Sequence, residues 1–175
     1  MQTRMITAIL LALVFSASSA DEVAHDAPLK VDLDTVVSTG VVHPVDGITS
    51  AGQPDEAALK VFAEQGYTTV IDLRTEGEDR GLDEASAVKG LGMSYVLLPI
   101  GRDSINFESA KALDKLIEDA DGPVLVHCGS ANRVGALLAL RKSLEGADDA
   151  TALEYGKAGG MTSLEAEVKE LLSTD

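Results

Sequence analysis

The chain has 175 residues, of which 45% are hydrophobic, and this is enough for one domain with its own core. Aromatic residues make up only 3% and Trp is absent, so Leu, Val, Ile and Ala must build that core. The formal net charge of −15 argues against a nucleic-acid partner, because neutralising phosphates requires Lys and Arg. An anionic membrane would also repel this surface.

Residues 1–20 have the three-part layout of a secretory signal peptide. Arg4 supplies a positive charge, residues 5–15 form an apolar run, and the small residues Ser18 and Ala20 precede a charged stretch. A membrane-spanning helix needs about 20 apolar residues, so this run is too short to serve as an anchor. We therefore expect cleavage after Ala20, export to the periplasm or outside the cell, and no integral membrane segment in the mature protein.

The rest of the sequence predicts a single folded domain. Residues 21–40 are expected to be a flexible mature N-terminus, and residues 41–173 to form the domain. The predicted strands cover residues 48–54, 67–73, 94–100 and 124–126. The predicted helices cover residues 55–65, 82–89, 107–120, 133–144, 148–158 and 163–172.

Strands alternate with helices along this domain, which is typical of an α/β fold. We expect a mostly parallel sheet of four to five strands with helices on both faces. Asp55 can cap the first helix, whose residues Ala58, Leu59 and Phe62 share one face. Residues 124–126 are fully apolar, which favours a strand in the middle of the sheet.

Cys128 is the only cysteine, so it cannot form an internal disulfide. It lies where the apolar strand at residues 124–126 ends and the helix from residue 133 begins. Ligands of open α/β sheets bind outside the carboxyl ends of the strands, and helix N-termini favour anions. Cys128 is therefore either an inert buried thiol or a reactive one at an anion site.

The residues after Cys128 favour the reactive interpretation. Four residues lie between Cys128 and Arg133, and a loop of this size can turn its N–H groups inward as an anion-binding nest. The Arg133 guanidinium adds a fork of donors that can grip two phosphate oxygens. The same positive surroundings would favour a thiolate near neutral pH. The predicted phosphate-binding residues are Gly129, Ser130, Ala131, Asn132, Arg133 and Val134.

The pattern His-Cys-x4-Arg at residues 127–133 resembles the His-Cys-x5-Arg signature loop of cysteine-dependent protein tyrosine and dual-specificity phosphatases, with one residue fewer between Cys and Arg. Residues 50–54, 69–74 and 127–140 also resemble a bacterial family of formerly unknown function. That family is related to the phosphatase-like domain of β-lactamase-hydrolase-like proteins, and the similarity covers roughly residues 40–172. The resemblance implies a single-domain protein-tyrosine-phosphatase-like fold.

The resemblance also implies a mechanism. The Cys128 thiolate would attack phosphorus, and water would hydrolyse the resulting phosphocysteine. His127 matches the histidine that orders the loop and tunes the thiolate through backbone contacts. Asp103, on a polar loop, is the candidate general acid, and Glu108 is a weaker one; Asp103 can equally be a solvated carboxylate or a helix cap. No cofactor and no metal are expected.

Two residues depart from the family pattern. Ala131 stands where the family usually has Gly, and Val134 stands where many relatives have Ser or Thr. That hydroxyl stabilises the leaving thiolate in the second step, and Val134 cannot donate. Ser130 is a candidate substitute. We therefore expect slow breakdown of the phosphoenzyme or weak activity.

The remaining polar residues are expected to have structural roles or none. Arg74 could line the rim of the pocket, but a surface salt bridge to Glu76 or Glu78 is the favoured interpretation. Asp72 is interpreted as structural. Ser50 and Gln53 belong to a segment that resembles the family but have no chemical role assigned. His25 and His43 do not show metal-ligand spacing.

Three functions remain open from the sequence. The leading one is a phosphatase acting on phosphotyrosine, phosphoserine or a small phosphorylated molecule. The second is a sulfurtransferase of the rhodanese type, which also uses a cysteine loop. The third is an anion-binding module with little or no turnover. The oligomeric state stays open, with a monomer compatible with the sequence.

Overall fold

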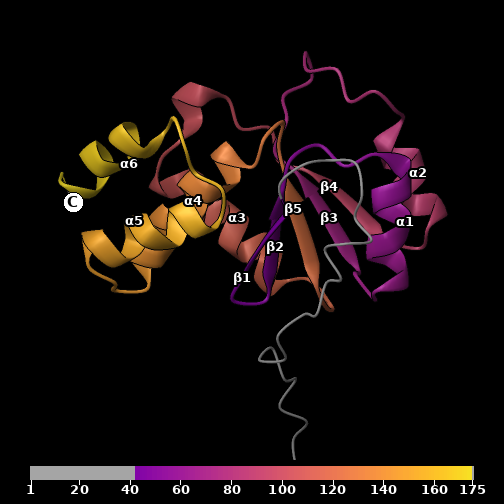
Figure 1. The fold of residues 1–175 in the computed structure, drawn as a ribbon, viewed down its shortest axis with the longest axis horizontal. Helices are drawn as coiled ribbons and strands as arrows, with labels where there is room; N and C mark the ends of the chain where they lie inside the picture. Colours follow the sequence, from indigo (N-terminus) through magenta and orange to yellow (C-terminus); the bar gives the residue numbers. More distant parts are fainter. Residues whose placement is uncertain (1–41, 175) are drawn as a thin grey trace, which may run out of the picture.

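The computed structural model describes residues 42–174 (Figure 1). The predicted signal peptide, its cleavage site and the predicted flexible N-terminus lie outside the described residues. Within residues 42–174, no helix combines the length and the apolar character needed to cross a membrane.

A five-stranded sheet lies at the centre of the molecule, in the order β1-β2-β5-β3-β4. The strands are β1 (Val42–Val45), β2 (Ile48–Ala51), β3 (Thr69–Asp72), β4 (Ser94–Leu97) and β5 (Val124–His127). Only β1 is antiparallel to its neighbour; β2, β5, β3 and β4 are parallel. The predicted α/β class and mostly parallel sheet are confirmed, and the apolar strand β5 is the central one.

Helices cover both faces of this sheet. They are α1 (Glu56–Glu64), α2 (Glu84–Gly90), α3 (Phe107–Glu118), α4 (Asn132–Leu144), α5 (Asp149–Ala158) and α6 (Glu165–Leu172), with a short 3-10 helix η1 (Arg102–Ser104). Helices α1 and α2 lie on one side of the sheet, and α3 to α6 gather on the other (Figure 1).

The local signals read from the sequence explain where several elements begin and end. The Asp55 side chain accepts a hydrogen bond of 2.8 Å from the Ala58 N–H and caps α1, as predicted. Leu59 and Phe62 on that helix are fully buried. The sequence also held a hairpin signal that the prediction missed. Asp46 and Gly47 both have positive φ, which fits the tight turn between β1 and β2.

Two separate apolar clusters lie on the two faces of the sheet. In β5, Val124 and Val126 pack into the cluster under α3 to α6, whereas Leu125 packs against α1 and α2. This alternation continues past the end of the strand. Cys128 belongs to the first cluster, and His127 therefore points to the opposite face. The two adjacent residues thus reach different environments.

Candidate active site

Cys128 directly follows the central strand and lies just before the N-terminus of α4. Its N–H donates to the Ala51 carbonyl at 3.3 Å, and an isolated bridge joins Gly52 to Ser130. These contacts fix the start of the loop against the end of β2. The thiol is 1% exposed. The structure therefore places Cys128 at the sheet position where α/β folds bind ligands.

Arg133 turns back over this loop and interacts with the Cys128 side chain. Its Nη1 and Nη2 donate to the two Glu78 carboxylate oxygens at 2.7 and 2.6 Å, and Nη1 also donates to the Ile100 carbonyl at 2.9 Å. The Glu78 hydrogen bonds are the main cause that raises the pKa of Arg133. Arg133 in turn lowers the pKa of Glu78 to about 2. Glu78 was not singled out from the sequence as a site residue, because it lies in a charged loop 55 positions away.

These contacts leave part of the guanidinium available. An arginine side chain has five N–H donors in a planar fork. Glu78 takes one on each terminal nitrogen, and Ile100 takes the second on Nη1. Among the residues that the structure describes, no oxygen accepts from Nε or from the remaining N–H of Nη2, and the Cys128 side chain is the other group with which the guanidinium interacts. An oxyanion held by Arg133 would therefore use these two donors, with Glu78 fixing the opposite edge of the fork.

The backbone conformation at Ala131 explains why the family usually has Gly at this position. Its φ is 64°, in the left-handed region that residues with a Cβ seldom adopt. The Ala131 side chain is fully buried against Gly160. A Cβ on Gly160 would lie 2.6 Å from the Ala131 Cβ. Gly160 thus makes room for the methyl group that Ala131 brings into the loop.

Asn132 ties the loop to the connection between α5 and α6. Its Oδ1 accepts from the Thr162 N–H at 2.7 Å, and its Nδ2 donates to the Ser163 hydroxyl at 2.8 Å. Ser50, for which the sequence suggested no role, donates to the Gly159 carbonyl at 2.7 Å and holds the same connection from β2. The Asn132 side chain therefore supports the loop from outside.

The two departures from the family pattern differ in their surroundings. Val134 is fully buried in the apolar cluster, so no hydroxyl stands at that position beside the thiol. Ser130 is exposed at the loop surface. Gly129 is also exposed, and a Cβ there would lie 3.8 Å from Arg133 Nη2, in ordinary contact.

Asp103 lies on η1, three residues after Ile100, whose carbonyl contacts Arg133. Its side chain is exposed and, within residues 42–174, makes no hydrogen bond or ion pair. Glu108 is exposed in the first turn of α3. The structure thus brings Cys128 and Arg133 together and anchors the segment before Asp103 to Arg133. The acid role of Asp103 stays a prediction.

His127 meets two carboxylates, whereas backbone contacts were expected for it. Its Nε2 lies 2.7 Å from Glu84 Oε1 and 3.9 Å from Asp72 Oδ1, and all three side chains are buried. Neither ring nitrogen makes a hydrogen bond to a described residue, so the His127 ring and Glu84 are in close contact without one. Glu84 was not predicted as a site residue; its only sequence signal was a position at the start of a short helix.

The burial of Arg74 differs from what the sequence predicted. The favoured interpretation was a surface salt bridge, but the residue is only 6% exposed. Its guanidinium donates to the Gln53 side chain and to the Asp79 carbonyl, and its Nε lies 3.5 Å from Glu78. The predicted Glu78 partner is therefore right, and the predicted surface position is wrong. Arg74 links the loop that carries Glu78 to the segment that carries Gln53.

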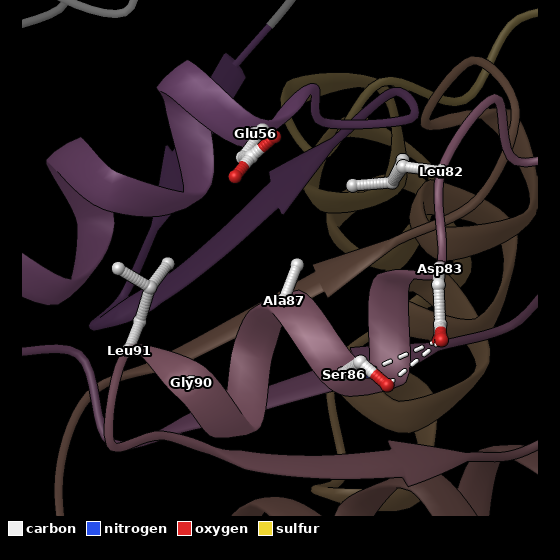
Figure 2. A pocket seen from close by; sticks show the side chains of 7 residues that line it. All are labelled: Glu56, Leu82, Asp83, Ser86, Ala87, Gly90 and Leu91. Carbon is white, nitrogen blue, oxygen red and sulfur yellow. Dashed lines mark hydrogen bonds between the residues drawn. The ribbon is translucent and has the colours of Figure 1, made fainter.

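A separate hollow lies between α1 and α2 (Figure 2). The seven residues that line it are Glu56, Leu82, Asp83, Ser86, Ala87, Gly90 and Leu91. None of them is cationic, and Figure 2 shows Asp83 engaged with Ser86. Two carboxylates without a balancing cation repel a phosphate, so this hollow is a poor candidate for the anion site.

The sheet order, the loop after the central strand and the helix after Arg133 define a protein-tyrosine-phosphatase-like α/β fold. A sequence model of the phosphatase-like domain of beta-lactamase hydrolase-like proteins matches residues 44–145. The chain belongs to this family, as the sequence resemblance implied.

Known relatives agree with this assignment. A beta-lactamase hydrolase-like protein of Agrobacterium fabrum is 31% identical over 118 residues, which cover 65% of this chain and 27% of that protein. The chain thus spans about a quarter of that relative's length. A putative phosphatase from Neisseria meningitidis has a TM-score of 0.62 at 19% identity, covering 71% of this chain and 92% of that one. TpbA from P. aeruginosa in complex with pTyr has a TM-score of 0.53 at 17% identity, covering 73% and 86%.

Proposed function

We propose that this protein is a phosphatase that hydrolyses phosphate monoesters through a phosphocysteine intermediate on Cys128. The observation that carries the proposal is the joint position of Cys128 and Arg133. The thiol follows the central strand, and the guanidinium of Arg133 turns back to it from the first turn of α4. The small residues between them allow the loop to present its N–H groups to an oxyanion.

In the first step, the Cys128 thiolate attacks phosphorus, the S–P bond forms and the P–O ester bond breaks. Arg133 and the loop N–H groups hold the equatorial oxygens, on which negative charge is spread. Asp103 donates a proton to the leaving oxygen, which departs as an alcohol or phenol.

In the second step, water attacks the phosphocysteine. A new O–P bond forms, the S–P bond breaks, and Asp103 accepts the proton that water releases. The thiolate leaves without help from a hydroxyl at Val134, which is buried and apolar. We therefore expect this step to limit turnover.

The anion site and one fold neighbour support a proposal for the substrate class. TpbA binds pTyr, and an aryl phosphate has a better leaving group than an alkyl phosphate. We propose phosphotyrosine or a small aryl phosphate as substrate, with other phosphomonoesters as slower ones. The acidic surface, with a net charge of −15, disfavours heavily phosphorylated polyanions.

Purified protein and its Cys128→Ser variant test the proposal on para-nitrophenyl phosphate and on thiosulfate with cyanide. We expect phosphate release that is lost in the variant, because serine is a far weaker nucleophile at this site. Thiocyanate formation would establish the sulfurtransferase instead. Phosphate binding without either product would establish the anion-binding module.

A paired comparison identifies the acid. Asp103→Asn should lower kcat for phenyl phosphate by about 10²- to 10⁴-fold. The effect should be small for an ester whose leaving group needs no proton. Glu108→Gln removes a carboxylate five residues further on. If Glu108→Gln shows the large leaving-group-dependent loss and Asp103→Asn does not, the acid is Glu108.

We further propose that the protein is exported and that its N-terminal 20 residues are removed. The support is the arrangement of a positive charge, an apolar run and small residues in that segment. Mass spectrometry of the protein from the periplasmic fraction should give Asp21 as the first residue. Protein retained in the cytoplasm with its N-terminal segment would contradict the proposal.

A further inference from the structure

One side chain ties the first turn of α4 to residues 159–164, called here the α5–α6 connection. Asn132 begins α4. Its Oδ1 accepts from the Thr162 N–H at 2.7 Å and from the Leu164 N–H at 3.4 Å. Its Nδ2 donates to the Ser163 hydroxyl at 2.8 Å. Asn132 therefore engages three consecutive residues of the α5–α6 connection.

The α5–α6 connection is a firm support, because it is buried where it meets the sheet. Gly159, Gly160 and Met161 are all buried. Ser50 on β2 donates to the Gly159 carbonyl at 2.7 Å, and the Met161 N–H donates to the Gly156 carbonyl at 2.9 Å. A side chain that is bonded to this connection is thereby held relative to the sheet as well.

The start of α4 has no side-chain cap. Ala131 occupies its N-cap position and supplies no side-chain hydrogen bond. The Gly135 N–H donates to the Ala131 carbonyl at 2.9 Å, so the N–H groups of Asn132, Arg133 and Val134 precede the first bond of the helix. An Asn side chain commonly caps such groups, but the Asn132 carboxamide is turned to the α5–α6 connection. This helix end is therefore left open to an oxyanion.

Arg133 is held from two sides. Its guanidinium is fixed by Glu78 and by the Ile100 carbonyl, and its backbone directly follows Asn132. The guanidinium and the N–H groups of the first turn must converge on one anion, so the direction of that turn decides whether they do. Helix ends fray when few contacts hold them. Loss of the Asn132 hydrogen bonds would therefore loosen the donors at this end.

We propose that Asn132 is a positioning residue that aims the first N–H groups of α4 and the Arg133 guanidinium at a bound oxyanion. Its own carboxamide faces the α5–α6 connection and acts through these groups. The α5–α6 connection is then part of the support of the candidate site. This inference deepens the proposed phosphatase function and rests on it for the identity of the substrate, whereas oxyanion binding is measurable without turnover.

The first test is the affinity for tungstate, a stable tetrahedral oxyanion, measured by isothermal titration calorimetry at pH 7. Asn132→Ala should weaken tungstate binding about tenfold, which corresponds to losing roughly one well-aimed hydrogen bond to a charged group. Circular dichroism must show that each variant is folded under these conditions. An affinity in Asn132→Ala equal to that of the parent would overturn the proposal.

Asn106→Ala is the matched control. The Asn106 Oδ1 accepts from the Ser109 N–H at 2.9 Å at the start of α3, so the same chemical change removes the same kind of hydrogen bond. We expect this variant to lose stability and to bind tungstate within about twofold of the parent affinity. Equal weakening in Asn106→Ala and Asn132→Ala would mean that reduced stability is sufficient, and would contradict the proposal.

The second test uses the unaltered protein and the reciprocity of linked equilibria. If the Asn132 hydrogen bonds strengthen tungstate binding about tenfold, bound tungstate must strengthen those hydrogen bonds by the same factor. Amide hydrogen exchange at Thr162, whose N–H is bonded to Asn132, should then slow about tenfold in saturating tungstate. Exchange at Ser109, whose N–H is bonded to Asn106, should change much less. Equal changes at the two amides would overturn the proposal, and this result decides alone if Asn132→Ala does not fold.

These outcomes separate the inference from the proposed function. A protein that binds tungstate with the expected Asn132 dependence but releases no phosphate from esters would retain the inference and lose the phosphatase. A phosphatase whose tungstate affinity is the same in the parent and in Asn132→Ala would retain the function and lose the inference. A parent protein that does not bind tungstate would overturn the inference, because no oxyanion would then be held at the start of α4.

Discussion

The two faces of the sheet are built on different principles. The face under α3 to α6 is built mainly from apolar residues, and α4 contributes seven consecutive buried residues from Val134 to Leu140. The face under α1 and α2 has a smaller apolar cluster, and at the carboxyl ends of its strands it buries Asp72, Glu84 and His127. Cys128 and His127 are neighbours in sequence but belong to different faces.

This difference separates two tasks of the candidate site. Close apolar packing fixes the position of α4 and with it Arg133 and the loop, because interiors at this density tolerate little displacement. The other face contributes buried ionisable side chains, whose charge depends on pH in a way that apolar packing does not. Changes on the apolar face should therefore act mainly on stability, and changes on the charged side mainly on pH dependence.

Gly135→Ala should have the largest effect on stability, because α4 approaches the end of α5 at this residue. A Cβ on Gly135 would lie 2.3 Å from the Met161 nitrogen and 2.4 Å from the Gly156 carbonyl oxygen. Both are backbone atoms that cannot turn away. We expect the free energy of unfolding to fall by about 3 kcal/mol or more in urea denaturation.

Gly90→Ala is the control for this substitution. Gly90 ends α2, and a Cβ there would meet no atom within 4 Å. Its free energy of unfolding should stay the same or rise by less than about 1 kcal/mol. Equal losses in the two variants would show that the close approach of α4 to α5 does not limit stability, and the proposed division between the faces would fail.

Glu78→Gln tests the charged contact at Arg133 through its pH dependence. Arg133 lowers the pKa of Glu78 from 4.5 to about 2, so ionised Glu78 stabilises the fold above about pH 4.5. That contribution is lost as the pH falls toward 2, where the carboxylate becomes protonated. We expect a loss at pH 7 on the order of 1 kcal/mol, since solvent screens this partly exposed pair. The difference from the parent should shrink between pH 4.5 and pH 2.5.

Urea unfolding at pH 7, 4.5, 3.5 and 2.5 measures this difference, with Glu76→Gln as the matched control. Glu76 is an exposed carboxylate two residues earlier in the same loop. Its variant should follow the parent at every pH. A constant gap between Glu78→Gln and the parent across this range would mean that the Arg133 contact does not link Glu78 ionisation to folding.

Much of this arrangement could be predicted from the sequence because its signals are local. The cap at Asp55 and the apolar strand before Cys128 lie within short segments, and both were confirmed in the fold. The closeness of Arg133 to Cys128 is likewise local in sequence. Glu78 and Glu84 could not be predicted in the same way. Their contacts with Arg133 and His127 span 55 and 43 positions, and nothing in a charged loop or a short helix shows which carboxylate turns inward. Arg74 was placed on the surface for the same reason, since its burial depends on Gln53 from another segment.

Ala131→Gly, in the loop between β5 and α4, should have the smallest effect. An alanine at φ 64° costs about 1–2 kcal/mol relative to an ordinary backbone conformation. Glycine avoids that cost but gives the unfolded chain more freedom, which offsets about 0.5–1 kcal/mol. A net gain of about 0.5 kcal/mol in the free energy of unfolding is therefore expected.

A double-mutant cycle with Gly160→Ala shows whether the gain arises at this contact. An added Cβ on Gly160 would lie 2.6 Å from the Ala131 Cβ, so removing the Ala131 methyl group relieves part of that clash. Gly160→Ala should thus cost less stability in the Ala131→Gly background than in the parent. Additive costs would mean that the positive φ of Gly160, 95°, and its approach to His43 determine the loss, and that Gly160 does not serve to accommodate Ala131.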